Sequence, residues 1–297
     1  MKWERPPRRL ALITGASSGI GRAFARMLAD RGYDVALTAR RGPRLEALAH
    51  ELREKGVAAF ALPKDISKLT ATDELLNAVA IRDRHVDVLI NNAGFGVPGD
   101  YAATSWEQQH ASLQLMLTSV CEMTHKVLPG MLERGYGRIV NVASVAGLLP
   151  GGAGVNMYGA TNTLYGATKS FLIRFSQSLH VETLGTGVRV TALCPGFTLS
   201  EFHDVEGTRE MATRFTPRWL WSTPEAVARS GWRAVEAGRP VVVPGWKNKA
   251  AGALAKMAPD DLVLGALGYK RRWEQSRRSL PPPAEAKPVP AVEADAA

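Results

Sequence analysis

Short runs of consecutive apolar residues alternate along this chain with longer amphipathic segments. The runs indicate buried strands, because a strand covered on both faces shows no polar side in its sequence. They lie at residues 10–13, 35–38, 58–62, 86–90, 138–142, 188–193 and 240–243. The amphipathic segments, which indicate helices, lie at residues 20–31, 44–55, 72–83, 106–133, 164–184 and 224–237. This repetition predicts an α/β fold, a doubly wound sheet of seven parallel strands with helices on both faces.

One large α/β domain and its extensions account for the 297 residues. We expect the domain at residues 8–245. Residues 246–279 indicate a helical extension with a basic end, and residues 280–297, almost without large apolar side chains, are expected to be a disordered tail. The basic extension either rests weakly on a membrane surface or packs on the edge of the domain, and we favour the second interpretation.

A net charge of +9 raises the question of a nucleic-acid partner, but Lys and Arg are dispersed and no nucleic-acid motif occurs. We expect no such partner and assign the charge to a phosphorylated cofactor and a solvated face. Cys121 and Cys194 lie far apart and outside metal-ligand spacing, so neither a disulfide framework nor a metal site is expected. This use of cysteine fits a reduced cytoplasm. No apolar stretch is long enough for a signal-peptide core or a membrane span, so neither is expected.

A glycine-rich segment follows the first expected strand and opens the first expected helix. Glycines there allow a tight turn and a close approach of the backbone, and the amides at a helix N-terminus attract anions. This placement predicts a site for the pyrophosphate of a dinucleotide. The residues expected to form it are Gly15, Ser17, Ser18, Gly19, Ile20 and Gly21.

The end of the second expected strand indicates which dinucleotide binds. Ala39-Arg40-Arg41 stands where a carboxylate would bind the ribose hydroxyls of NAD(H). Arg40 offers instead a planar fork for a 2′-phosphate, so NADP(H) is favoured over NAD(H). The alternative is that Arg40 and Arg41 only begin a solvated loop before Pro43.

Two nearly identical pentapeptides, Tyr158-Gly-Ala-Thr-Asn162 and Tyr165-Gly-Ala-Thr-Lys169, lie close together, and only the second has a lysine four residues after its tyrosine. On a helix these two positions share a face, so the Lys169 ammonium can favour ionisation of the Tyr165 phenol. A phenol, whose pKa is ordinarily about 10, would then exchange a proton near neutrality. We expect this pair to be the chemical centre.

Together these motifs resemble the short-chain dehydrogenase/reductase superfamily of NAD(P)-dependent Rossmann-fold oxidoreductases. The resemblance covers about residues 8–245 and includes the glycine-rich segment, Asn91-Asn-Ala-Gly94, Ser144, Tyr165 with Lys169, and Cys194-Pro-Gly-Phe-Thr198. It implies three catalytic residues. Tyr165 would be the general acid or base, Lys169 would hold the nicotinamide ribose, and Ser144 would hydrogen-bond the substrate carbonyl.

The resemblance also implies a path for the cofactor along the strand ends. Asp65 and Ile66 would contact the adenine, Asn91, Ala93 and Gly94 would line the middle, and Pro195, Gly196 and Thr198 would meet the nicotinamide. Three of the polar residues named for catalysis or cofactor binding could instead have a purely structural role. Asp65 can cap a helix, Ser144 can satisfy a turn, and Asn91 can tie strands together.

Two features depart from the family pattern. The family's serine-to-tyrosine spacing is close to that between Ser144 and Tyr158, so a duplicated heptad either lengthens the helix at its start or bulges the loop before it. We prefer Tyr165, since Asn162 cannot supply the charge of Lys169. The second departure is Met116, where the family carries an asparagine that relays protons to the lysine and which a thioether cannot replace.

The resemblance implies hydride transfer between NADP(H) and a carbonyl or secondary alcohol of a small molecule. Residues 94–100, 148–157 and 198–221 would line the substrate site, and their large apolar side chains favour an apolar substrate. A second hypothesis is a nucleotide-binding sensor or scaffold whose catalysis is impaired by Met116 and the duplicated heptad. A homodimer or homotetramer through the long helices after the fourth and fifth strands is also implied.

Overall fold

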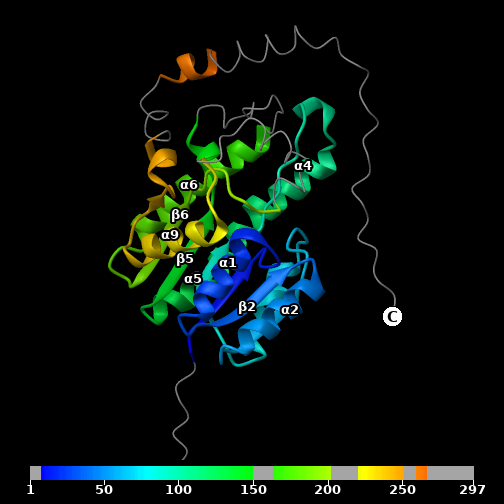
Figure 1. Cartoon of the computed structure of the whole chain (residues 1–297), viewed down its shortest axis with the longest axis vertical. Coiled ribbons are helices and arrows are strands. Elements are labelled where there is room, and N and C mark those ends of the chain that lie inside the picture. Colours follow the sequence, from blue (N-terminus) through cyan, green and yellow to red (C-terminus); the bar gives the residue numbers. More distant parts are fainter. Residues whose placement is uncertain (1–7, 150–162, 202–219, 251–258, 266–297) are drawn as a thin grey trace, which may run out of the picture.

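Seven strands form one sheet in the order β3-β2-β1-β4-β5-β6-β7 (Figure 1). The computed structural model describes residues 8–149, 163–201, 220–250 and 259–265. Every neighbouring pair of strands runs parallel. The predicted doubly wound sheet is therefore confirmed. Its strands are β1 (Leu10–Thr14), β2 (Asp34–Ala39), β3 (Ala59–Pro63), β4 (Val86–Asn91), β5 (Gly137–Val142), β6 (Val188–Leu193) and β7 (Val241–Val242).

Helices connect the strands and lie on both sides of the sheet (Figure 1). Within the described ranges, none of them combines the length and the apolarity that a bilayer crossing needs. The helices are α1 (Gly19–Ala29), α2 (Gly42–Arg53), α3 (Ala71–Ala80), α4 (Trp106–Leu113), α5 (Ser119–Glu133), α6 (Thr163–Glu182) and α9 (Pro224–Glu236). Short 3-10 turns occur at η1 (Tyr101–Ala103) and η3 (Val145–Leu148).

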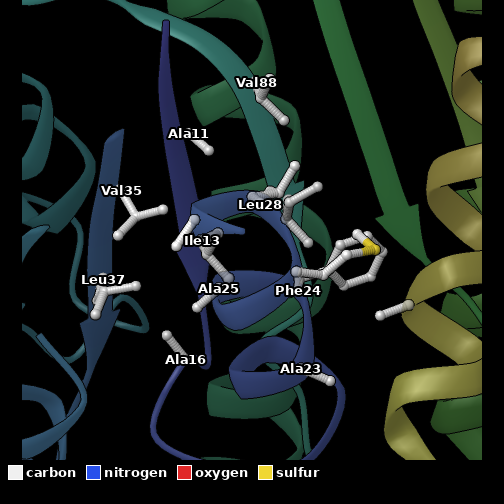
Figure 2. Close-up of a cluster of buried hydrophobic side chains, with 14 of the residues drawn as sticks. Ala11, Ile13, Ala16, Ala23, Phe24, Ala25, Leu28, Val35, Leu37 and Val88 are labelled. Atoms are coloured by element: carbon white, nitrogen blue, oxygen red, sulfur yellow. The ribbon is translucent and has the colours of Figure 1, made fainter. Parts of the chain in front are cut away.

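One face of the sheet is covered by α1, α2 and α9. Ala11 and Ile13 of β1 lie on this side, in a buried cluster with Phe24 and Leu28 of α1 (Figure 2). Phe24 and Leu28 are both fully buried, and burying a side chain of this size stabilises the fold by about 1.5–3 kcal/mol. This cluster fixes α1, and with it the glycine-rich loop at the start of α1, against the sheet.

The opposite face of the sheet is covered by α3, α5 and α6. Leu10 and Leu12 of β1 lie on this side, because successive side chains of a strand point to opposite faces. All residues of β1 are buried as a result. The apolar run in the sequence is continuous for this reason: the strand has no solvent-facing side.

The helix expected over residues 106–133 is not regular. It divides into α4, a π-helical turn η2 (Gln114–Thr118) and α5. The amphipathic pattern of residues 106–133 predicted one continuous helix and not this turn. π turns inside α-helices are frequent at functional sites, and η2 contains Met116.

Parts of the sequence predictions lie outside the described residues. Residues 246–250 and 260–265 are helical, within the range expected to form the C-terminal extension. The basic end of that extension, the 280–297 tail and Tyr158 fall in the ranges that are not described. The two explanations of the duplicated heptad therefore both stay open.

Candidate active site

The strand order reverses beside β1, because the chain passes outward to β2 and β3 and then returns to β4 on the other side of β1. In open α/β sheets, ligands bind at such a reversal, beyond the carboxyl ends of the strands. Gly15 follows β1 here, and Asn92 follows β4. A β-carbon on Gly15 would lie 2.7 Å from Asn92 Nδ2, and Gly15 also has a φ of +66°. Glycine is therefore required at this point.

Thr14 and Asn92 fasten the two strand ends together. Thr14 Oγ1 accepts hydrogen bonds from the amides of Asn92 and Ala93 at 2.9 and 3.0 Å. Asn92 Nδ2 donates to the carbonyl of Thr14 at 2.9 Å and to that of Gly15 at 3.3 Å. Sequence reasoning missed Asn92 as a residue of the site. The signal was its place directly after a buried strand, next to Asn91.

The amino end of α1 is open to an anion. Its N-cap residue Ser18 makes no side-chain capping hydrogen bond, and the first turn contains no acidic residue. A β-carbon on Gly21 would lie 2.4 Å from the carbonyl oxygen of Gly15, so the loop folds closely over the helix start. Ile20 packs on the core, whereas Ser17 and Ser18 lie at the loop. The backbone amides here can bind a phosphate group.

Of the two arginines that follow β2, Arg41 contacts the glycine-rich loop. Arg41 Nη2 donates to Ser17 Oγ at 3.0 Å and to Ser18 Oγ at 3.1 Å, whereas Arg40 is exposed. Beside it, Arg44 of α2 and Arg41 both form ion pairs with Glu201. The predicted contact of Arg40 with a 2′-phosphate stays a prediction.

Asp65 and Ile66 follow β3, and both side chains make contacts within the protein. Asp65 Oδ1 accepts hydrogen bonds from Ser67 N at 3.1 Å and Ser67 Oγ at 2.7 Å. Asp65 thus closes a local turn ahead of α3 and does not cap that helix. Ile66 is buried in the core below α3. A contact of these two residues with an adenine stays a prediction.

Asn91 belongs to a buried polar network beneath the site. Its Nδ2 donates to Asn141 Oδ1 at 2.8 Å and to Thr124 Oγ1 at 3.3 Å. Asn141 Nδ2 in turn donates to Ser176 Oγ at 2.9 Å. The network joins β4, β5, α5 and α6, as the structural alternative for Asn91 expected. The side-chain amide nitrogen of Asn91 is thus committed to this network, and a contact of Asn91 with a cofactor stays a prediction.

Lys169 and Tyr165 are neighbours on α6, at the carboxyl end of β5. The Lys169 side chain is buried, and its Nζ donates to the carbonyl of Val142, the last residue of β5, at 2.8 Å. The same Nζ lies 5.4 Å from the centroid of the Tyr165 ring. Tyr165 is partly exposed, so its ring lies between a buried cation and the surface.

Ser144 follows β5 and begins η3, where its Oγ accepts a hydrogen bond from the amide of Ala146 at 3.2 Å. Ser144 thus satisfies a backbone amide of this turn, which is the structural role that the sequence left open for it. A β-carbon on Gly147 of η3 would lie 2.5 Å from the carbonyl carbon of Lys169, and Ser170 Oγ donates to the carbonyl of Gly147 at 2.9 Å. The turn that carries Ser144 is therefore packed directly onto the helix that carries Tyr165 and Lys169.

Met116 lies in the π turn η2 and is completely buried. A β-carbon on Gly94 would lie 3.0 Å from Met116 Sδ and 3.7 Å from Lys169 Nζ. The thioether and the lysine ammonium therefore approach the same glycine. The thioether can neither donate a proton nor accept one usefully at this place.

Pro195, Gly196 and Thr198 follow β6. The carbonyl of Pro195 accepts a hydrogen bond from the amide of Val145 at 3.0 Å, which joins this segment to the turn of Ser144. Thr198 is buried and its Oγ1 donates to the carbonyl of Gly196 at 3.1 Å. Asn248 covers Gly196, where a β-carbon would lie 2.7 Å from Asn248 Nδ2. Asn248 was not predicted as a residue of the site, because it lies in the range that was assigned to the C-terminal extension.

Comparisons with known proteins find similarity to dehydrogenases, both in sequence and in structure. The family described as short chain dehydrogenase matches residues 9–210. An NADP-dependent 3-hydroxy acid dehydrogenase of Salmonella typhi is 35% identical over 75% of this chain and 87% of its own. A short-chain dehydrogenase from Sphingobium yanoikuyae, solved in complex with NADPH, has a TM-score of 0.70 and 30% identity, covering 93% of this chain and 99% of its own. A bulky-bulky ketone specific alcohol dehydrogenase from Comamonas testosteroni has a TM-score of 0.67 and 26% identity, covering 93% and 97%.

Proposed function

This chain belongs to the short-chain dehydrogenase family, and from that premise we propose that it transfers a hydride between NADP(H) and a carbonyl or secondary alcohol of an apolar small molecule. One observation carries the proposal. The buried ammonium of Lys169 lies 5.4 Å from the centroid of the Tyr165 ring, at the same edge of the sheet as the glycine-rich loop. A proton-exchanging pair and a dinucleotide cradle at one edge are what such a reaction needs.

The glycine-rich loop fits the pyrophosphate of a dinucleotide. β-Carbons on Gly15 and Gly21 would fill the cradle, and no side chain caps the start of α1 in the described structure. When bound, NADP(H) supplies or accepts the hydride. The residues that would hold it are those of the loop together with Asp65, Ile66, Asn91, Ala93, Gly94, Pro195, Gly196 and Thr198.

The proton chemistry would belong to three side chains of α6 and η3. Tyr165 would hold the proton that the substrate oxygen receives during reduction and would take it back during oxidation. The Lys169 ammonium would stabilise the charge that develops on the tyrosine oxygen. Ser144 accepts a hydrogen bond from a backbone amide, so its hydroxyl proton can be donated to the substrate oxygen.

NADP(H) is proposed over NAD(H) because Arg41 and Arg44 both lie beside the loop, and paired guanidinium groups suit a phosphate monoester. Arg41→Ala is expected to weaken NADPH binding roughly tenfold and NADH binding little. Fluorescence titration of both nucleotides measures this. Arg40→Ala is the matched control, expected to bind NADPH within about twofold of the wild type. A larger loss in the Arg40 variant than in the Arg41 variant would contradict the assignment.

An apolar substrate is proposed because aromatic side chains gather beyond β6. The rings of Phe197 and Trp221 lie 5.5 Å apart, and Leu148 packs near the end of β6. Phe202, Phe215 and Trp219, also expected there, lie outside the described residues. The direct test is NADPH oxidation with a panel of apolar and polar ketones and aldehydes. Turnover confined to the apolar members supports the proposal, and NADPH binding without turnover of any member contradicts it.

The second candidate function, a nucleotide-binding sensor, rests on Met116 beside Lys169. If proton resupply limits the enzyme, Met116→Asn is expected to raise kcat by roughly twofold to tenfold over Met116→Leu, because an amide can relay protons. Steady-state kinetics at saturating NADPH, with melting curves of both variants, measures this. Equal kcat values in the two variants would show that the methionine does not limit proton supply.

A homodimer or homotetramer is proposed through the outer face of α5 and α6. Phe171 is 43% exposed and stacks on Phe175 at 5.9 Å, and Val181 is 65% exposed. A groove beside them, lined by Cys121, His125 and Leu128, would be covered by a second copy. Sedimentation velocity measures the assembly. Cys121 and Cys194 form no disulfide in the described part of the chain, which supports the proposed cytoplasmic location.

A further inference from the structure

A carboxylate lies between the two arginines that border the glycine-rich loop. Glu201 Oε2 lies 2.7 Å from Arg41 Nη1, and Glu201 Oε1 lies 2.7 Å from Arg44 Nη1. Arg41 contacts Ser17 and Ser18 with its other terminal nitrogen. Glu201 therefore occupies one terminal nitrogen of each guanidinium group, and both nitrogens are donors that a phosphate could also use.

Glu201 comes from a different part of the chain than its partners. It belongs to the segment after β6. A β-bridge between Thr198 and Ser222 holds this segment in place, and the Leu199 amide donates a hydrogen bond to the carbonyl of Ser222 at 3.0 Å. A β-carbon on Gly19 would lie 2.9 Å from Ser200 Cβ. The segment thus lies directly on the glycine-rich loop, and this packing delivers the carboxylate to the arginines.

The Glu201 carboxylate is ionised near neutral pH. Its partial burial by itself would raise the pKa of Glu201, but the hydrogen bonds and charges of Arg41 and Arg44 outweigh burial and hold the pKa below its ordinary value. A carboxylate and a phosphate both present paired oxygens to a guanidinium fork. Glu201 is therefore a chemical stand-in for a phosphate at these arginines.

We propose that Glu201 is a specificity-determining residue of the cofactor site, which competes with the 2′-phosphate for Arg41 and Arg44 and so limits the preference for NADP(H) over NAD(H). The inference rests on the proposed NADP(H) site. The two arginines carry two positive charges, and Glu201 removes one of them. A 2′-phosphate, with a charge of about −1.5 to −2, therefore meets a site of reduced charge and a like-charged neighbour. Glu201 does not compete with an adenosine ribose that lacks the 2′-phosphate, because such a ribose does not use the two arginines.

The competition can be measured with two fragments of the cofactor. Adenosine 2′,5′-bisphosphate carries the 2′-phosphate, and 5′-AMP lacks it. Glu201→Gln is expected to tighten the bisphosphate by roughly threefold to tenfold in calorimetric titrations and to leave 5′-AMP within about twofold. In the Arg41→Ala background the gain is expected to shrink to less than about twofold, because the carboxylate and the phosphate no longer share that arginine.

Glu225→Gln is the matched control. Glu225 lines the same small pocket as Glu201, but no ion pair in the described part of the chain joins it to Arg41 or Arg44. The Glu225→Gln variant therefore removes one negative charge near the site and leaves the ion pairs of Glu201 with Arg41 and Arg44 in place. Its bisphosphate affinity is expected to rise by less than about twofold at 0.15 M salt.

The outcomes separate this inference from the proposed function. A bisphosphate affinity that is unchanged or weaker in folded Glu201→Gln overturns the competition, since Glu201 would then only order the arginines. An equal gain in Glu225→Gln also overturns it. A wild-type protein that does not distinguish the bisphosphate from 5′-AMP, with no effect of Arg41→Ala, would remove the NADP(H) assignment itself.

Discussion

Tyr165→Phe is expected to lower kcat for carbonyl reduction by about 10²- to 10⁴-fold, the usual contribution of a general acid. The phenylalanine ring keeps the packing against Lys169, whose Nζ lies 5.4 Å from the centroid of the tyrosine ring. Only the hydroxyl is lost, and with it the proton for the substrate oxygen. NADPH affinity should stay within about threefold, because Lys169, Val142 and the glycine-rich loop are unchanged.

Steady-state kinetics with the best ketone of the panel, together with NADPH titration, measures both quantities. Tyr33→Phe is a matched control at the opposite edge of the sheet. Tyr33 precedes β2 and its hydroxyl lies 3.0 Å from that of Tyr136, so the control removes a comparable hydroxyl far from the chemistry. Its kcat should equal that of the wild type. A Tyr165→Phe enzyme with undiminished kcat would leave Tyr158, or no tyrosine at all, as the proton donor.

Gly21→Ala is expected to raise the NADPH dissociation constant by about 100-fold or more, equivalent to about 3 kcal/mol. In an ordinary helix this change would stabilise the protein by roughly 1 kcal/mol. Here the new β-carbon would lie 2.4 Å from the carbonyl oxygen of Gly15 and 2.6 Å from Asn92 Nδ2. Both neighbours belong to the cradle, so relief of the collision must displace the backbone that would hold the pyrophosphate.

Gly265→Ala is the control for this prediction. Gly265 is also helical, and among the described residues no atom outside the backbone of its own helix lies within 4 Å of its added β-carbon. NADPH titration and thermal melting of both variants separate a local effect from general destabilisation. The control should bind NADPH like the wild type. A folded Gly21→Ala protein with wild-type affinity would mean that the pyrophosphate lies elsewhere.

The sheet could be predicted because its strands are buried on both faces. Such strands appear as unbroken apolar runs, and a parallel order follows when each is separated from the next by an amphipathic helix. The run at residues 10–13 is an example, since all residues of β1 are buried. By contrast, the π turn at Gln114–Thr118 was missed. It carries Met116, which the fold places beside Gly94 and Lys169, and no local motif predicts that packing.

The elements that carry the candidate site were predictable, but some of its side chains were not. The Tyr165 and Lys169 pair follows from helix geometry alone, since positions i and i+4 share a face. Arg41, Asn92, Asn248 and Glu201 could not be placed, because loop side chains owe their directions to long-range packing. Glu201 reaches Arg41 across 160 residues of sequence, a contact that no local pattern encodes.

The measurement closest to the central claim is transfer of deuterium from [4-²H]NADPH to a ketone. Each diastereomer of the labelled cofactor would be incubated with the wild-type enzyme and an apolar ketone, and the alcohol would be analysed by mass spectrometry. The account predicts deuterium on the carbinol carbon from one diastereomer only, at a rate that falls about 10²-fold or more in Tyr165→Phe. Alcohol without deuterium from either diastereomer, or labelled alcohol formed equally fast by Tyr165→Phe, would contradict it.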